Sequence, residues 1–208
     1  MSMAPASSQS EERWLTAYFE RYRRILLQCE VIAQLIHLKE VLCATQAAGK
    51  KVILAGNGGS AAIASHGAVD FTKNARIRCV NFNEADLITC FANDYGYEHW
   101  VEQALEFYAD PGDLVVLISS SGQSRNMVNA ARYTVERGLT LVTFTGFAKN
   151  NPLQQWGHLN FWVDSRAYNV IEMTHQMWLL AVCDLIVSAN EPQATPAGAD
   201  TRERGMVL

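Results

Sequence analysis

Several features that would assign this sequence of 208 residues to a special class of protein are missing from it. No uninterrupted apolar run approaches the ~18 residues expected of a membrane-spanning helix, so we expect no transmembrane segment. The opening residues, MSMAPASSQS, have neither the basic region nor the apolar region of a secretory signal. These absences favour a cytoplasmic protein that does not enter a membrane.

The sequence also has few cysteines and no excess of basic residues. Its five cysteines, Cys29, Cys43, Cys79, Cys90 and Cys183, include no CxxC pair, which favours reduced thiols over a disulfide framework. Lys and Arg total 17 against 21 Asp and Glu, so the formal net charge is −4 and no basic surface for nucleic acid is expected. A hydrophobic content of 49% and a charged content of 18% are ordinary for a globular domain with a core of its own.

The segment from Glu11 to about Ala48 contains no Pro and no Gly, and its apolar residues recur every three or four positions, which predicts helix. The stripe consists of Trp14, Tyr18, Tyr22, Ile25, Cys29, Ile32 and Ile36, with Leu15, Phe19 and Leu26 beside it. A helix that packs on one domain needs only one apolar face. Two interpretations stay open: helices folded over their own domain, or a helical arm buried in a subunit interface, which we favour.

After Gly49 short apolar runs alternate with helical patterns. We expect strands near 52–55, 77–82, 114–118, 140–145 and 159–163, and helices near 60–72, 97–108, 124–137 and 169–188. Such alternation predicts an α/β fold, a three-layer αβα sandwich around a five-stranded parallel sheet. We therefore divide the chain into a disordered start (1–10), a helical oligomerisation arm (11–48), the α/β domain (49–190) and a flexible tail (191–208).

The first candidate site is the turn between the strand at 52–55 and the helix that follows it. Gly56-Asn57-Gly58-Gly59-Ser60 combines glycines, which let a phosphate approach the backbone, with a helix N-terminus, whose free N–H groups attract anions. Asn57 and Ser60 are suited equally to capping this helix and to touching a ligand.

A second turn of the same kind follows the strand at 114–118. Ser119-Ser120-Ser121-Gly122-Gln123-Ser124 places four hydroxyls in six residues before the next helix. Because the carboxyl ends of parallel strands meet at one edge of the sheet, both turns are expected to face one ligand. Two such turns favour a phosphorylated ligand.

Three further groups could take part in chemistry, and each has an ordinary structural explanation as well. His66 and Asp70 lie four residues apart on one helix face, either as a functional pair or as structural residues. Asn93-Asp94 after an apolar run is a turn signal by itself. Glu172 and His175 interrupt the last, largely apolar helix, and either lie exposed near its start or belong to a site.

The two turns and the final helix, which ends in Cys183-Asp184-Leu185-Ile186, resemble the sugar isomerase (SIS) domain family over roughly residues 11–188. The most similar branch is bacterial phosphoheptose isomerase, and a related branch contains proteins that bind the replication initiator. The resemblance implies a homotetramer that converts sedoheptulose 7-phosphate to a heptose 7-phosphate for lipopolysaccharide or capsule precursors. It also implies sugar-phosphate contacts from Asn57, Gly58, Gly59, Asn93, Asp94, Ser119, Ser120, Ser121 and Ser124.

The sequence departs from that branch at three implied catalytic positions. Asp70 replaces a glutamate, Glu172 replaces a glutamine, and Leu180 replaces a histidine, whereas His66 is retained. Leucine cannot transfer a proton, so we predict that acid–base catalysis falls to Glu172 and Asp70 with His66 or His175. His66, Asp70 and Glu172 could also hold a divalent ion such as zinc, although no cofactor is expected to be obligatory.

The alternative function is a non-catalytic SIS module that binds a phosphosugar or a protein. The missing histidine supports this alternative, whereas the added carboxylate of Glu172 supports an isomerase. In both cases we expect a phosphorylated sugar and further copies of the chain as partners, and no direct contact with nucleic acid or membrane.

Overall fold

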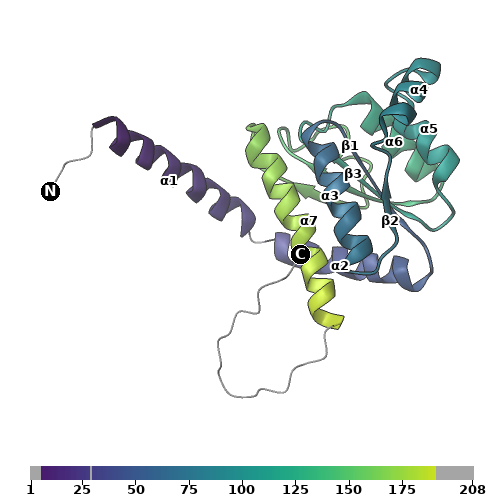
Figure 1. Ribbon diagram of the computed structural model, residues 1–208, viewed down its shortest axis with the longest axis horizontal. Coiled ribbons are helices and arrows are strands. Elements are labelled where there is room, and N and C mark those ends of the chain that lie inside the picture. Colours follow the sequence, from purple (N-terminus) through teal and green to yellow (C-terminus); the bar gives the residue numbers. More distant parts are fainter. Residues whose placement is uncertain (1–5, 29, 191–208) are drawn as a thin grey trace.

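The computed structural model describes residues 6–28 and 30–190, which form seven helices and five strands (Figure 1). In chain order they are α1 (Ala6–Leu26), α2 (Val31–Ala47), β1 (Val52–Gly56), α3 (Gly59–Lys73), β2 (Cys79–Asn81), α4 (Ala85–Tyr95), α5 (Trp100–Tyr108), β3 (Leu114–Ser119), α6 (Arg125–Glu136), β4 (Thr140–Thr145), β5 (Leu159–Trp162) and α7 (Tyr168–Asn190).

The five strands form one parallel sheet in the order β2-β1-β3-β4-β5. All five residues of β1 and all six of β3 are buried, because the centre of a parallel sheet is covered on both faces. Gly56 at the end of β1 pairs in register with Ile118 in β3. The turns that follow these two strands therefore lie side by side at the carboxyl ends of the strands.

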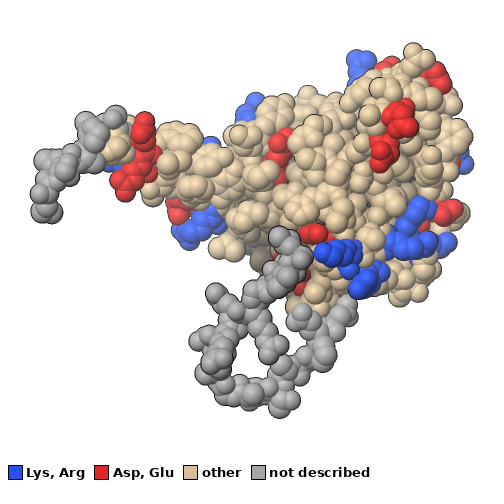
Figure 2. Space-filling view, viewed as in Figure 1, with Lys and Arg blue, Asp and Glu red and all other residues tan. Residues whose placement is uncertain are grey.

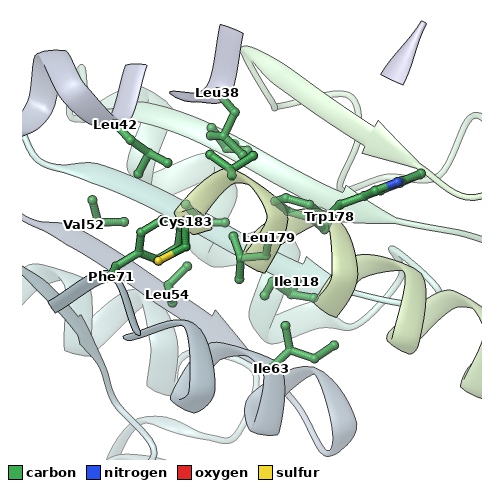
Figure 3. Close-up of a cluster of buried hydrophobic side chains, with 14 of the residues drawn as sticks. Leu38, Leu42, Val52, Leu54, Ile63, Phe71, Ile118, Trp178, Leu179 and Cys183 are labelled. Carbon is green, nitrogen blue, oxygen red and sulfur yellow. The ribbon is translucent and has the colours of Figure 1, made fainter. Parts of the chain in front are cut away.

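Side chains that alternate along the strands divide the core into two clusters. Val52 and Leu54 of β1 point to the face covered by α2, α3 and α7, whereas Ile53 and Ala55 point to the face covered by α5 and α6. Figure 3 shows the first cluster, in which α7 lies between α2 and α3 and contributes Trp178, Leu179 and Cys183. The predicted three-layer αβα sandwich with a five-stranded parallel sheet is confirmed.

The amino-terminal segment consists of two helices with different surroundings. Helix α1 projects away from the body of the molecule (Figure 1) and leaves Trp14 and Phe19 more than 60% exposed. Helix α2 buries Val31, Leu35, Leu38 and Leu42 against the sheet. Helix α1 begins at Ala6, so residues 6–10 are helical and were wrongly included in the disordered start, while residues 1–5 and the predicted tail at 191–208 lie outside the described part of the chain.

The predicted stripe of the arm packs on the domain only in part: Ile25 lies against the core, and Tyr22 Oη donates to the Asn169 carbonyl at 3.1 Å. Ile32 and Ile36 of α2 are 51% and 47% exposed, and they lie beside the residues that α2 buries. Cys29, which belongs to the stripe, lies outside the described residues. Within one chain the stripe is therefore largely uncovered.

The helix α4 was not predicted. Its apolar residues Leu87, Ile88 and Phe91 recur at helical spacing, yet none of its eleven residues is buried. Asn93 and Asp94, interpreted as a turn signal, lie in its last turn, and the chain reverses at Gly96 with φ = 88°. The run was too short to distinguish a helix from a strand by periodicity alone.

The edge strand β5 is shielded by side chains instead of a further strand. Gln28 Nε2 donates to the Trp162 carbonyl and Gln34 Nε2 to the Asn160 carbonyl, both at 3.3 Å. An uncovered edge would present such carbonyls to other chains. The junction of α1 and α2 thus satisfies two outward-facing acceptors of the sheet.

The charges on the surface and the apolar last helix are relevant to the expectation that the protein contacts neither nucleic acid nor a membrane. On the face shown in Figure 2, several Lys and Arg side chains gather at the lower right with Asp and Glu beside them, and the other charged side chains are scattered among uncharged ones. Within α7, the stretch Tyr168–Ala189 is long and apolar enough to cross a membrane by length and composition alone. Half of its apolar window is buried, as in a core helix of a globular domain, and its contacts with α2 and α3 account for its apolar character.

Candidate functional site

The first turn connects β1 to α3 through two glycines. Gly58 precedes the helix with φ = 56°, a left-handed conformation that side chains disfavour. Asn57 and Ser60 make no side-chain cap of α3, so the capping explanation of these two residues does not apply. Ser60 is buried, and its hydroxyl faces the second turn across a small pocket.

The second turn places its serines between β3 and α6. Ser119 Oγ accepts the Gly122 N–H and Ser121 Oγ accepts the Gln123 N–H, both at 3.2 Å, which fixes these hydroxyls on the loop. Ser124 immediately precedes α6, and its side chain makes no capping hydrogen bond. Each of these hydroxyls can still donate to a ligand.

The two turns enclose one pocket of about 120 Å³ at the carboxyl edge of the sheet. Its lining residues share short polar side chains, apart from one tyrosine and one glutamate: Asn57, Ser60, Ser119, Ser120, Ser121, Ser124, Tyr168 and Glu172. Helices α3 and α6 both begin here, so their electropositive ends face the same space. Hydroxyl donors and two helix N-termini make this pocket suited to a phosphate group.

Glu172 enters the pocket from α7 and lies against the start of α3. Its Oε1 accepts a hydrogen bond from Ser120 Oγ at 3.4 Å. A side chain on Gly59 would overlap the Glu172 carboxylate, so the glycine makes room for it. Of the two explanations given for Glu172, the structure favours the one in which it lines a site.

An amide pair holds the two turns together. Asn57 Nδ2 donates to Asn126 Oδ1 at 3.0 Å, and Asn126 Nδ2 donates to Asn57 Oδ1 at 2.8 Å. Tyr97 Oη also donates to Asn57 Oδ1 at 3.1 Å. Asn126 is buried and was missed, because nothing in its sequence neighbourhood indicates a partner 69 residues away.

Tyr168, at the start of α7, is the second residue that sequence reasoning missed. It lines the pocket, is 56% exposed, and its ring packs edge-on against Phe147 with ring centroids 5.0 Å apart. A signal existed in the sequence, because Tyr168 lies one helical turn before Glu172 and shares its helix face.

His66 and Asp70 pair with each other outside the pocket. His66 Nε2 lies 3.3 Å from Asp70 Oδ2, and His66 Nδ1 lies 3.3 Å from Gln176 Nε2 of α7. The pair lies where α3 contacts α7 through Gln176, and Val69 and Met177 on these two helices are exposed. With a rise of about 1.5 Å per residue, His66 lies roughly 10 Å along α3 from Gly59.

His175 belongs to the interior instead of the pocket. It is fully buried, its Nε2 lies 3.0 Å from the Thr145 carbonyl, and its ring meets Phe144 edge-on. Burial lowers the pKa of His175 to about 4, against a smaller opposite effect of the Thr145 carbonyl. The expectation that His175 is a catalytic candidate is therefore corrected: a neutral imidazole shut off from the pocket cannot exchange protons with a ligand there.

Asn93 and Asp94 also lie away from the pocket in a single chain. Asp94 contacts Asn93 and the exposed Cys90 on α4. Among the residues that the structure describes, no three His, Cys, Asp or Glu side chains are close enough to hold a metal ion. The suggested set of His66, Asp70 and Glu172 is thus not assembled within one chain, and the residues present do not fit a metal.

The arrangement of the pocket is suited to binding a phosphorylated polyhydroxy compound and to moving a proton on it. The hydroxyls and helix N-termini provide donors for the phosphate. The Glu172 carboxylate, about one hydrogen bond away from Ser120, provides a group that can accept or return a proton next to that phosphate.

Comparisons with known proteins agree with this geometry. A family model described as the SIS domain matches residues 17–146. The phosphoheptose isomerase of Geobacter sulfurreducens is 30% identical over 180 residues, which cover 83% of this chain and 95% of that protein.

Solved structures with the same fold include a phosphoheptose isomerase and a protein solved in complex with ManNAc-6P. The phosphoheptose isomerase from Neisseria gonorrhoeae superposes with a TM-score of 0.78 at 24% identity, covering 86% of this chain and 98% of that one. The NanR protein of Vibrio vulnificus, solved in complex with ManNAc-6P, gives a TM-score of 0.65 at 12% identity, covering 89% and 66%. At these identities both show a common fold and nothing finer.

Proposed function

The chain belongs to the SIS domain family, in the branch of the phosphoheptose isomerases, and on that premise we propose that it is an aldose–ketose isomerase of sugar phosphates. The observation that carries the proposal is the single pocket in which the serine turn, the glycine turn and Glu172 meet. In the finer form of the proposal, the enzyme converts sedoheptulose 7-phosphate to a heptose 7-phosphate in the cytoplasm, for lipopolysaccharide or capsule precursors.

The proposed chemistry needs one group that moves a proton between neighbouring carbons of the sugar. A base removes the proton from the carbon next to the carbonyl, while a serine hydroxyl of the pocket or a water molecule gives a proton to the carbonyl oxygen. In the resulting enediol the other hydroxyl returns a proton to that donor, and the base delivers its proton to the former carbonyl carbon. We assign the base to Glu172, which is the only carboxylate among the residues that line the pocket. The serines hold the phosphate, so that the reacting carbons are presented to this carboxylate.

We propose that His66 and Asp70 contribute to the site only when several subunits assemble. Within one chain they lie outside the pocket, yet Val69, Met173 and Met177 around them are 46–59% exposed. Apolar side chains in such numbers on neighbouring helices indicate a contact surface. We propose a homotetramer in which these exposed side chains and the arm are covered by other subunits, so that the pair meets a site completed by a neighbour.

A second candidate function is a phosphosugar-binding or protein-binding module without turnover. Two observations favour it: Leu180 occupies the position at which the related enzymes carry a histidine, and His175 is buried away from the pocket. The structural similarity to NanR shows a common fold and does not separate the two functions.

The two functions are separated by assaying the purified protein with sedoheptulose 7-phosphate and with hexose and pentose phosphates, and following the product by chromatography. For the isomerase we expect turnover, and Glu172→Gln should lower kcat by at least the ~100-fold typical of a lost general base. Substrate binding should weaken far less, because the phosphate contacts remain.

Tyr133→Phe, which changes a residue of α6 away from the pocket, is the matched control and should keep the full rate. Binding of a sugar phosphate without any isomerisation would support the module instead. Turnover that survives Glu172→Gln intact would reject Glu172 as the base and leave the His66–Asp70 pair as the candidate.

A further inference from the structure

We infer that Asn126 and Tyr97 are positioning residues, which fix the side-chain amide of Asn57 so that it presents an N–H group, and no free carbonyl oxygen, to a ligand. The inference rests on the proposed function in taking the pocket between the two turns as the binding site of a phosphorylated compound. It adds two residues that do not line this pocket, one of them from the turn between α4 and α5.

The first observation is how the polar atoms of the Asn57 side chain are occupied. A side-chain amide has two N–H donors and a carbonyl oxygen with two lone pairs. Asn57 Oδ1 accepts from Asn126 Nδ2 at 2.8 Å and from Tyr97 Oη at 3.1 Å, which uses both lone pairs. Asn57 Nδ2 donates to Asn126 Oδ1 at 3.0 Å, which uses one of its two N–H groups. The other N–H is all that this amide has left for a ligand in the pocket that it lines.

The second observation is that the main partner of Asn57 is itself fixed. Asn126, in the first turn of α6, is only 2% exposed, and both polar atoms of its amide are paired with Asn57. Turning the Asn57 amide alone would bring oxygen against oxygen and N–H against N–H. Because Asn126 is buried, water could not replace the two lost hydrogen bonds. The buried amide therefore holds the amide of Asn57 in one orientation.

The third observation is that Tyr97 is held in place independently of its own hydroxyl. Asn129 Nδ2 donates to the Glu98 carbonyl at 2.8 Å, which fixes the turn between α4 and α5 on helix α6. Asn126 and Asn129 lie three residues apart, so one face of α6 holds both the Asn57 amide and the turn that carries Tyr97. Tyr97 is 53% exposed, so burial of its ring does not account for the contact of its hydroxyl with Asn57.

These contacts favour a phosphate over a ligand group that donates hydrogen bonds. A phosphate dianion has only acceptor oxygens, and a carbonyl oxygen turned towards it would be repelled. An amide that is already oriented as a donor avoids this repulsion and loses little conformational freedom when the ligand binds. Asn126 and Tyr97 should thus raise the affinity for a phosphorylated ligand without touching it.

The test measures binding of inorganic phosphate and of sedoheptulose 7-phosphate by calorimetry on the full-length protein. Tyr97→Phe removes one hydroxyl and keeps the ring, and Asn129 still holds the turn. We expect this variant to bind sedoheptulose 7-phosphate about fivefold more weakly, the scale of one neutral hydrogen bond. Tyr108→Phe, at the exposed end of α5, is the matched control and should bind both probes like the wild type.

Double variants show whether the two residues act through Asn57. Asn126→Ala should weaken binding about tenfold, and neither Asn126→Ala nor Tyr97→Phe should weaken it further in a protein that already carries Asn57→Ala. Circular dichroism checks the fold, and the cycle with Tyr97 decides the matter even if Asn126→Ala does not fold. Losses that add up in either cycle would overturn the positioning role of that residue. A Tyr97→Phe protein that binds like the wild type, or a wild-type protein that binds neither probe, would overturn the inference as a whole.

The turnover assay distinguishes this failure from failure of the proposed function. In an active isomerase, Tyr97→Phe should raise KM and leave kcat nearly unchanged, because the Asn57 amide contacts the phosphate equally before and during the reaction. Turnover with KM and kcat unaltered by Tyr97→Phe would reject the positioning role and leave the isomerase standing. Non-additive losses of affinity in a protein that isomerises nothing would support the positioning roles and reject the isomerase.

Discussion

Individual residues of the pocket divide into those whose side chains are available to a ligand and those that hold neighbouring side chains in place. Ser121 belongs to the first kind, because its hydroxyl lines the pocket and already accepts the N–H of the exposed Gln123. Ser121→Ala removes one donor to the phosphate, and water can replace the lost contact with Gln123.

We therefore expect Ser121→Ala to weaken binding of a sugar phosphate by about 1–3 kcal/mol, with little change in the free energy of unfolding. Calorimetry with phosphorylated and unphosphorylated sugar measures the first quantity, and thermal unfolding measures the second. Ser188→Ala, on the exposed end of α7, is the control and should alter neither. Equal affinity of the wild-type protein for both sugars would contradict the assignment of this turn to phosphate.

His175 links the interior to the pH dependence of stability. Its pKa falls from 6.5 to about 4 on folding, so between these values the unfolded chain binds a proton that the folded chain refuses. The contribution of neutral His175 to the free energy of unfolding is fully present above pH 6.5 and is lost as the pH falls towards 4. A shift of this size corresponds to roughly 3 kcal/mol.

Denaturant unfolding at a series of pH values checks this prediction. His175→Gln should flatten the decline of the unfolding free energy between pH 6.5 and 4, even if it lowers stability at pH 7. His37→Gln, which changes an exposed residue of α2, should leave the slope as it is in the wild type. The same slope in His175→Gln and in the wild type would show that other groups cause the acid sensitivity.

At the residue scale, sequence reasoning brought to one pocket the side chains whose positions depend on local structure, and their contact with a ligand stays a prediction. The serines and Asn57 were found because a strand, a turn and a helix in succession fix where their side chains lie. His175 was expected at the site but lies in the interior, because the depth to which a helix face is buried depends on neighbours far away in sequence. Asn126 was missed for the same reason, since its partner lies in another turn.

At the scale of elements, the start of α3 and the first turns of α7 act as one unit. Gly59 is the contact point, because any side chain there would displace the Glu172 carboxylate. A glycine is needed at position 59 because α3 and the Glu172 side chain of α7 lie close together there. At Gly58 it is the positive φ that requires a glycine.

We expect Gly59→Ala to keep the fold, since alanine is favourable in a helix, and to lower kcat by about 100-fold through the displaced carboxylate. Circular dichroism and the isomerase assay measure the two effects. The double variant with Glu172→Gln should be no slower than Glu172→Gln alone, because residues in contact are not additive. A Gly59→Ala protein with the full rate would show that the carboxylate has room to move without consequence.

Sequence patterns located all five strands and the helices of the α/β domain except α4. The strands were readable because buried β-branched runs of a parallel sheet are bounded by glycines and helical patterns. Helix α4 has no buried residue, so it lacks the contrast between a buried and an exposed face from which helices are recognised. Helix α2 was predicted, yet its buried face, Val31, Leu35, Leu38 and Leu42, was not the stripe that the spacing had suggested.

At the scale of the whole molecule, helix α2 has one face that packs on the domain and an exposed face that we propose to be a subunit contact. Leu35 is buried against the domain, whereas Ile32, less than one turn away on the same helix, is 51% exposed. The two positions therefore form a matched pair on α2.

Ile32→Asp should dissociate the proposed tetramer and leave the melting temperature of the subunit nearly unchanged. Leu35→Asp should unfold the domain, because an unpaired carboxylate in the core costs several kcal/mol. Light scattering gives the mass of the assembly, and thermal unfolding gives the stability. An Ile32→Asp protein of unchanged mass, or a wild-type protein that is monomeric, would reject the proposed interface along α2.

The shielding of β5 by Gln28 and Gln34 has a consequence for how copies of this molecule can meet. Side-chain amides occupy carbonyls that an incoming strand would need, so the sheet cannot extend from one molecule into the next across that edge. The opposite edge, β2, offers only three residues. Growth by strand addition, the route to fibrils, is thus discouraged at both edge strands of the sheet.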